Sequence, residues 1–275
     1  MEYLRQCSIR GCWQAAILVV LALLCPLALL GADAPPFDTN PAFRPDGMQR
    51  VSEHVYVIPG FPNIGIVIGE RASLVVDTGL GPANGARVAA QAAKLAHAPK
   101  LYLVTTHFHP EHASGAAGFP KGTVLIRSRT QQRELVDDRG RTLALFERNP
   151  DFAPYLNGVS FRRPEILFDR EYLLDLGGVH ARVFWLGPAH TKGDQEIFIE
   201  EDSALFSGDL AMKGIPPRGF ATGSSWQTWI NILDQLSALR PAHVLPDHGE
   251  CGDASLIDAQ KAYLGSLLGS GPSQK

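Results

Sequence analysis

Four potential metal ligands fall within six residues of this sequence, directly after an apolar segment. Residues 101–105 have the composition of a buried β-strand, and His107, His109, Glu111 and His112 follow it. Imidazole and carboxylate groups are ligands for zinc and similar divalent ions. An extended segment directs the rings of His107 and His109 to the same side, and Glu111 and His112 are then expected to face a second ion. A fold that uses this cluster must end a buried strand at a metal site.

Three more candidate ligands also follow predicted strands. His190 lies in the segment Gly-Pro-Ala-His-Thr-Lys-Gly-Asp, Asp209 follows an apolar strand in Ser-Gly-Asp, and His248 lies in Pro-Asp-His-Gly. Each signal alone is weak, because an aspartate at a strand end is most often a cap or a turn former. Together with the first cluster these residues supply seven ligands, enough for two metal sites that share one carboxylate.

The order of predicted elements favours one domain built from two sheets with helices outside. Alternation and short apolar runs predict strands at residues 54–58, 64–68, 73–77, 101–105, 124–127, 165–168, 172–174, 181–186, 196–200, 204–207 and 244–245. Helical spacing of apolar residues predicts helices at residues 83–98, 128–148, 225–239 and 254–268. Residues 150–163 read as irregular.

Four motifs together resemble those of the metallo-β-lactamase superfamily of hydrolases. They are the HxHxEH variant of the family's HxHxDH cluster, the downstream GxxHTxGD, the Ser-Gly-Asp segment and the last PxHG. The resemblance covers about residues 50–265 and implies an α+β fold, a four-layer αββα sandwich with the metals at one edge between the sheets. Asp77 resembles the aspartate of the family's early Asp-Thr-Gly, which supports the metal ligands rather than binding metal.

The resemblance also implies which residues hold two zinc ions. The first ion would bind His107, His109 and His190. The second would bind the remaining ligands, with Asp209 bridging both ions: Glu111, His112 and His248. The family usually has aspartate at position 111 and glycine at position 247, so this chain departs from the pattern twice. Asp247 is either a partner of a metal ligand or an acidic turn residue.

Metal ions held in this way catalyse hydrolysis with a bound water as the nucleophile, so no serine or cysteine nucleophile is needed. Metal lowers the pKa of a bound water from about 15.7 towards 7, which gives hydroxide at neutral pH. Glu111 is the natural group to orient that water and shuttle its proton, and Asp209 is the second candidate catalytic residue. The sequence therefore predicts a zinc-dependent hydrolase that acts on a small carbonyl substrate such as a β-lactam, a lactone or a thioester.

Two questions about function stay open in the sequence. Lys213, Arg218 and Trp226 are candidate substrate-binding residues, since a cation beside aromatics binds a carboxylate; alternatively the cations are solvated and the aromatics belong to the core. An alternative function is an exported metal-binding accessory protein of a quinoprotein-type oxidation system with little hydrolytic activity. That function is favoured if Glu111 prevents an open coordination position.

Charge and the N-terminal segment bear on partners and compartment. The 275-residue chain has 25 bases and 28 acids, a net charge of −3, and offers no basic surface for nucleic acid.

A signal peptide is predicted over residues 1–34. The prediction rests on two arginines, an uncharged run over residues 15–30 and the small-residue segment Ala-Asp-Ala at 32–34. Its 16-residue apolar run is shorter than the roughly 20 residues of a membrane span. We therefore expect export to a bacterial periplasm without stable membrane association after cleavage; an uncleaved N-terminal anchor is the alternative.

The rest of the chain divides simply. Residues 35–49 are predicted to be an extended lead-in, residues 50–268 the hydrolase domain, and residues 269–275 a flexible tail.

Overall fold

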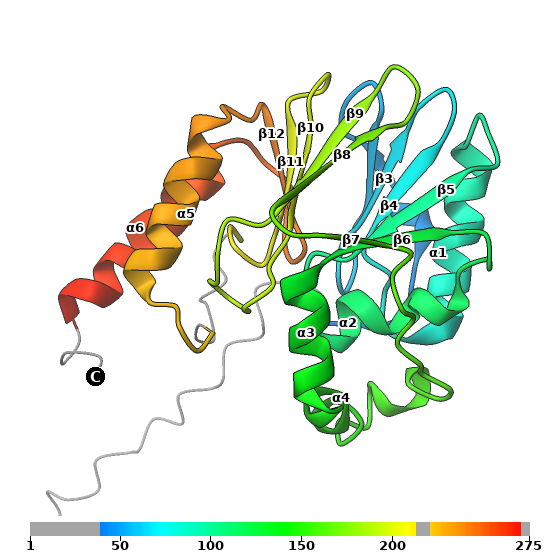
Figure 1. The fold of residues 1–275 in the computed structure, drawn as a ribbon, viewed down its shortest axis with the longest axis horizontal. Coiled ribbons are helices and arrows are strands. Elements are labelled where there is room, and N and C mark those ends of the chain that lie inside the picture. Colours follow the sequence, from blue (N-terminus) through cyan, green and yellow to red (C-terminus); the bar gives the residue numbers. More distant parts are fainter. Residues whose placement is uncertain (1–38, 213–220, 271–275) are drawn as a thin grey trace, which may run out of the picture. The chain divides into compact units, whose positions relative to one another are not determined.

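Short apolar segments of the chain form β-strands, which pair into two sheets (Figure 1). The computed structural model describes residues 39–212 and 221–270. The predicted signal peptide, Lys213 and Arg218 therefore lie outside the described residues. Within these two ranges, none of the helices has both the length and the apolar character of a membrane span.

The first sheet, as far as the chain is described, has seven strands in chain order. They are β1 (Gln49–Arg50), β2 (Val55–Ile58), β3 (Ile64–Ile68), β4 (Ser73–Val76), β5 (Leu101–Val104), β6 (Val124–Ser128) and β7 (Ile166–Phe168). Pairing is antiparallel from β1 to β4 and parallel from β4 to β7. The parallel half brings the carboxyl ends of β4, β5 and β6 to one edge.

The second sheet contains the remaining strands of the described ranges, in the order β12-β11-β10-β9-β8. Their bounds are β8 (Glu171–Asp175), β9 (His180–Phe184), β10 (Glu196–Ile199), β11 (Ala204–Gly208) and β12 (His243–Pro246). β11 and β12 are parallel, whereas the other neighbours are antiparallel. The carboxyl ends of β11 and β12 consequently lie side by side.

Helices cover the outer face of each sheet (Figure 1). The α-helices are α1 (Gly81–Leu95), α2 (Pro110–Ala113), α3 (Arg129–Asp138), α4 (Arg141–Phe146), α5 (Trp226–Ala238) and α6 (Ser255–Ser270). Three short 3₁₀-helices are η1 (Pro45–Gly47), η2 (Ser114–Gly118) and η3 (Ala153–Tyr155). α1 packs on the first sheet, and α5 and α6 pack on the second.

Three apolar clusters fill the spaces between these layers. Alternation along β4 shows the arrangement: Leu74 and Val76 join the cluster between the sheets, while Val75 joins the cluster under α1. On the second sheet, Ile197 faces the first sheet and Phe198 faces α5 and α6. The predicted four-layer αββα sandwich is confirmed by this order of helix, sheet, sheet and helix.

Local sequence explains where several helices begin and how closely they pack. The Ser128 hydroxyl accepts a hydrogen bond from Gln131 N at the start of α3, and Ser225 accepts one from Thr228 N at the start of α5. Gly85 allows α1 to lie directly against η2, because a Cβ atom at this position would overlap the carbonyl oxygen of Gly115. This packing fixes the segment that follows α2.

The predicted helix over residues 128–148 is wrong in one respect, because the structure divides it into α3 and α4. Arg139 and Gly140 have left-handed backbone conformations, with φ of 52° and 75°. A left-handed residue cannot continue a right-handed α-helix, and glycine adopts that conformation without steric cost. The chain therefore turns between α3 and α4.

The lead-in and the tail also differ from the prediction. Within the predicted lead-in over residues 35–49, Pro45–Gly47 forms the short helix η1 and Gln49 pairs with Val57 of β2. The end of the lead-in thus adds an edge strand to the first sheet. α6 extends through Ser270, two residues into the predicted tail at 269–275, and residues 271–275 lie outside the described residues.

Candidate metal centre

The candidate ligands follow the carboxyl ends of strands from both sheets. His107 and His109 follow β5, His190 lies in the loop after β9, Asp209 follows β11 and His248 follows β12. Because β11 and β12 are parallel, Asp209 and His248 leave the second sheet at the same edge. The two sheets bring these side chains together, which a single strand end cannot do.

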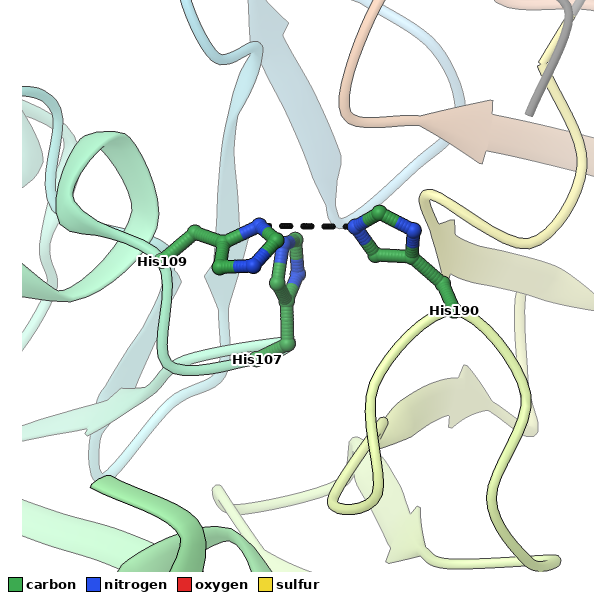
Figure 2. Close-up of side chains that lie close together, drawn as sticks. All are labelled: His107, His109 and His190. Atoms are coloured by element: carbon green, nitrogen blue, oxygen red, sulfur yellow. Dashed lines mark hydrogen bonds between the residues drawn. The ribbon is translucent and has the colours of Figure 1, made fainter. Parts of the chain in front are cut away.

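The first donor group consists of three histidines, His107, His109 and His190 (Figure 2). His107 Nε2 lies 3.0 Å from His109 Nδ1, and His190 Nε2 lies 3.4 Å from that same Nδ1. A tetrahedral zinc ion with bonds of about 2.0 Å separates its nitrogen ligands by roughly 3.3 Å. The three nitrogens therefore have the spacing of one metal site.

The backbone reaches this arrangement differently from the extended segment expected. Residues 106–109 bend after β5 instead of continuing the strand, and His109 immediately precedes α2. His107 is buried, whereas His109 and His190 are partly exposed. The first donor group is accordingly accessible from solvent on the side of His109 and His190.

The second donor group contains Glu111, His112 and His248. α2 carries the first two, and Glu111 Oε1 lies 3.6 Å from His112 Nε2. All three residues are buried. Neither Glu111 Oε2 nor His112 Nε2 has a hydrogen-bond partner among the described residues. Buried polar atoms without partners are costly, so these two atoms are suited to a ligand at this position.

Asp209 lies between the two groups. Its Oδ2 is 3.5 Å from His190 Nε2 and 4.0 Å from His107 Nε2, while its Oδ1 is 3.7 Å from His248 Nε2. One carboxylate oxygen thus faces each group. Asp209 is therefore close to both groups.

Two buried carboxylates support His112 from behind. Asp77 Oδ2 lies 2.9 Å from His112 Nδ1, and Asp247 Oδ2 lies 3.2 Å from the same atom. The Thr106 hydroxyl donates to Asp247 Oδ2 at 2.6 Å, and Thr106 N donates to Asp77 Oδ1 at 2.7 Å. Both carboxylates thus lie on the Nδ1 side of His112, and Thr106 joins them to the segment that carries His107. Asp247 also forms a third group of possible metal donors with His107 and His112.

The electrostatics of the two groups differ. Burial, together with neighbouring histidines, lowers the pKa values of His107 and His190 well below the ordinary value, so these rings are neutral. Burial opposes charge on His112, but the Asp77 and Asp247 carboxylates raise its pKa well above the ordinary value. Burial also opposes charge on Glu111, yet the nearby His112 ring, with His109 and His248, lowers its pKa to about 2. Glu111 is ionised at neutral pH.

These donors fit a divalent metal. Neutral imidazoles and an ionised carboxylate are the forms that bind zinc-like ions, and each group places three donor atoms within 4.8 Å of one another. The seven residues proposed from the sequence lie in one place: His107, His109, Glu111, His112, His190, Asp209 and His248. The described residues can therefore hold metal.

Aromatic side chains lie beside both groups. The ring of Phe61, in the turn between β2 and β3, is 5.0 Å from His248 and stacks on Phe152 at 5.2 Å. Phe152 in turn stacks on Phe146 of α4 at 5.4 Å. The Trp229 ring is 6.1 Å from His190. No local motif marks Phe61, because its partners lie far along the chain.

Trp226 does not have the position expected of a substrate contact. It is buried at the start of α5 in the apolar cluster beneath that helix, with its ring 6.2 Å from Trp229. This position favours the alternative that the aromatic residue belongs to the core. Lys213 and Arg218, the other two candidates for substrate binding, lie outside the described residues.

Comparison with known proteins agrees with this architecture. The family described as the metallo-beta-lactamase superfamily matches residues 57–248. A metallo-beta-lactamase from Pontibacter korlensis is 18% identical, with a TM-score of 0.60 over 79% of this chain and 98% of that chain. The stereoselective inverting sec-alkylsulfatase Pisa1 from Pseudomonas sp. is 17% identical, with a TM-score of 0.63 over 80% of this chain and 42% of the sulfatase. DIM-1 metallo-beta-lactamase, in a crystal exposed to ceftazidime, is 18% identical, with a TM-score of 0.62 over 84% of this chain and 100% of that chain.

The structural likenesses, at such identities, concern the fold. The family match extends over most of the chain and includes all seven candidate ligands. The chain belongs to the metallo-beta-lactamase superfamily.

Proposed function

We propose that this protein is a hydrolase that holds two zinc ions and acts on a small carbonyl substrate. The observation that carries the proposal is the position of Asp209, whose two oxygens face two separate groups of donors. The first ion would bind His107, His109 and His190. The second would bind the other group: Glu111, His112 and His248.

Zinc bound in this way supplies an activated water at neutral pH and a Lewis acid for the attacked carbonyl. Glu111 is ionised and buried beside the donors, so its carboxylate can accept the proton that the attacking water gives up. Asp209 would be shared by the two donor groups, since one of its oxygens faces each of them. Asp77 and Asp247 orient His112 by accepting at its Nδ1.

The substrate class follows from the site's surroundings. The partly exposed His109 and His190 leave one side open to a small molecule, and Phe61 offers an apolar surface beside His248. Similar structures include proteins named as β-lactamases and an alkylsulfatase. We propose a β-lactam, a lactone or a thioester as the substrate, with no nucleic-acid partner.

The proposed compartment is the bacterial periplasm, reached through cleavage close to residue 34. The motivation is the charged front, the apolar run and the Ala-Asp-Ala segment of the sequence. N-terminal sequencing of protein from a secreting host tests this directly. A mature chain that begins near residue 35 supports export, and an intact Met1 on membrane-bound protein contradicts it.

Hydrolysis itself is tested with a panel of chromogenic β-lactams, lactones and thioesters. The zinc-loaded protein is expected to hydrolyse at least one class, to lose that activity after chelation, and to regain it with added zinc. His107→Ala, which removes one of the three donors of the first group, serves as the variant without an intact first site. A zinc-loaded protein that hydrolyses no member of the panel contradicts the proposal and agrees with the accessory function instead, which neither the structure nor the comparisons favour.

A further inference from the structure

Helix α3 carries two polar side chains towards the loops that bear the first donor group. Gln131 and Glu134 are three residues apart and therefore lie on the same face of the helix. Gln131 is fully buried and Glu134 is half-buried, although the helix is strongly polar overall. Both residues lack any role in the metal chemistry described above.

Gln131 contacts the two chain segments that lead to the three histidines. Its Oε1 accepts a hydrogen bond from the Thr105 hydroxyl at 2.8 Å, and its Nε2 donates to the Thr105 carbonyl oxygen at 2.9 Å. The same Nε2 lies 3.3 Å from the carbonyl oxygen of Gly193. Thr105 is two residues before His107, and Gly193 is three residues after His190. One side chain thus joins both segments.

Glu134 holds the His190 loop through two further bonds. Its Oε1 accepts from Lys192 N and its Oε2 accepts from Gly193 N, each at 2.9 Å. Hydrogen bonds from backbone N–H groups to a carboxylate are stronger than those between neutral groups. A carboxylate that binds two consecutive amides fixes the direction of the loop as well as its distance from α3.

The contact between α3 and this loop is direct. A Cβ atom at Gly193 would overlap the backbone of Gln131, so glycine is required for the approach. Within the loop, Asp194 accepts hydrogen bonds from Thr191 N and Ala189 N, the two neighbours of His190. Asp194 therefore closes the loop internally, and Glu134 attaches the closed loop to the helix.

The second donor group has a different support. Asn63 Nδ2 donates to the carbonyl oxygens of Pro246 and Gly249, both at 2.8 Å, and Asn63 N donates to the Asp247 carbonyl oxygen at 2.6 Å. Asn63 thus holds the loop that carries His248, and α3 takes no part in it. The two loops can be disturbed independently.

We propose that Gln131 and Glu134 are positioning residues for the first metal ion, because they set the distance between His190 and the segment that carries His107 and His109. This inference rests on the proposed metal site. A site of three donors loses affinity for its ion when one donor moves. Residues that hold metal ligands in place typically contribute about 10- to 100-fold to metal affinity.

The test measures zinc affinity at each site separately, by competition with a chromogenic chelator. His248→Ala leaves the first site to be measured, and His190→Ala leaves the second. Glu134→Gln keeps the size of the side chain but removes its charge and leaves one of the two amides without an acceptor oxygen. We expect it to weaken the first site about tenfold, to shift the cobalt(II) absorption bands of that site, and to leave the second site unchanged. Glu134→Asp keeps the charge and is expected to restore part of the affinity; it also carries the test if Glu134→Gln does not fold.

Two controls separate positioning from a loss of overall stability. Asp137→Asn changes an exposed acid on the same helix and is expected to alter neither site. Asn63→Ala is expected to weaken the second site alone. Equal first-site affinity in Glu134→Gln and the parent overturns the inference, as does equal weakening of both sites together with a lower melting temperature of the metal-free protein. A parent that binds no zinc at the first site contradicts the proposed function instead.

Discussion

Asp77 and His112 form a pair that is closed to solvent, with Asp77 Oδ2 2.9 Å from His112 Nδ1. A carboxylate accepts hydrogen bonds, so Nδ1 carries the proton and Nε2 is left to face Glu111 and the second donor group. The pair thus decides which nitrogen of His112 is available to metal. Asp247 Oδ2 lies 3.2 Å from the same Nδ1 and favours the same tautomer of His112.

Replacing Asp77 by asparagine should weaken the second metal site by about 10- to 100-fold. Asparagine keeps the size but can turn an amide donor towards Nδ1, which no longer favours the required tautomer. Zinc titration against a competing chelator checks this, with Asp151→Asn, an exposed acid, as the control. Second-site affinity equal to that of the parent would show that the pair has no such role.

The two sites should respond differently to pH. The raised pKa of His112 means that this ring is protonated at neutral pH in the metal-free protein, and metal must displace one of its protons. Second-site affinity should therefore rise about tenfold per pH unit near neutrality, with release of about one proton. His107 and His190 have lowered pKa values and are already neutral, so first-site affinity should stay nearly constant.

Calorimetry in buffers of different ionisation enthalpy counts the released protons at each site, with His190→Ala and His248→Ala isolating the second and first sites. Because the pKa of Glu111 is about 2, that carboxylate is ionised throughout and adds no proton. Parallel pH dependence at the two sites would refute the assignment of the proton to His112.

Sequence reasoning succeeded where the signal is local. Apolar runs such as residues 101–105 marked the strands, and the ligands follow those strands in short motifs. The break at Arg139 and Gly140 was missed because apolar residues continue at helical spacing on both sides of it. Gln131 and Glu134 resemble surface residues of a charged helix, since their partners are 26 to 62 residues away along the chain. Contacts of that range depend on how the sheets pack.

Glu111 is the ligand at which this chain departs from its family. Glu111→Gln should abolish hydrolysis and leave the first metal bound, because neutral glutamine neither holds the second ion nor accepts a proton from water. Glu111→Asp keeps the charge on a shorter stem, and a displacement of about 1 Å can cost on the order of a hundredfold in rate. Its activity should be lower than that of the parent and should depend on added zinc.

The measurement is hydrolytic rate against free zinc for the parent and both Glu111 variants, on whichever substrate the panel identifies. Glu111→Gln that hydrolyses as fast as the parent would mean that this carboxylate is neither ligand nor base. The site would then work with the first ion alone, held by His107, His109 and His190.

Phe61 should contribute to substrate binding rather than to chemistry. Its ring lies between His248 and Phe152, so Phe61→Ala removes an apolar surface beside the second donor group. For a substrate with an aromatic group, KM should rise about tenfold, corresponding to about 1.4 kcal/mol, while metal content and kcat change little. Leu173→Ala, at an exposed position on β8, is the control. A KM that is unchanged for every substrate excludes this role.

The two groups of donors, with Asp209 between them, should together bind two metal ions. Elemental analysis of the purified mature protein, His107→Ala and His248→Ala after equilibration with zinc tests it most directly. Up to two zinc ions are expected in the parent and about one in each variant. The ion kept by His248→Ala is expected to occupy the all-histidine site, which cobalt(II) absorption can distinguish. Unchanged zinc content in both variants would contradict the assignment of these residues as ligands.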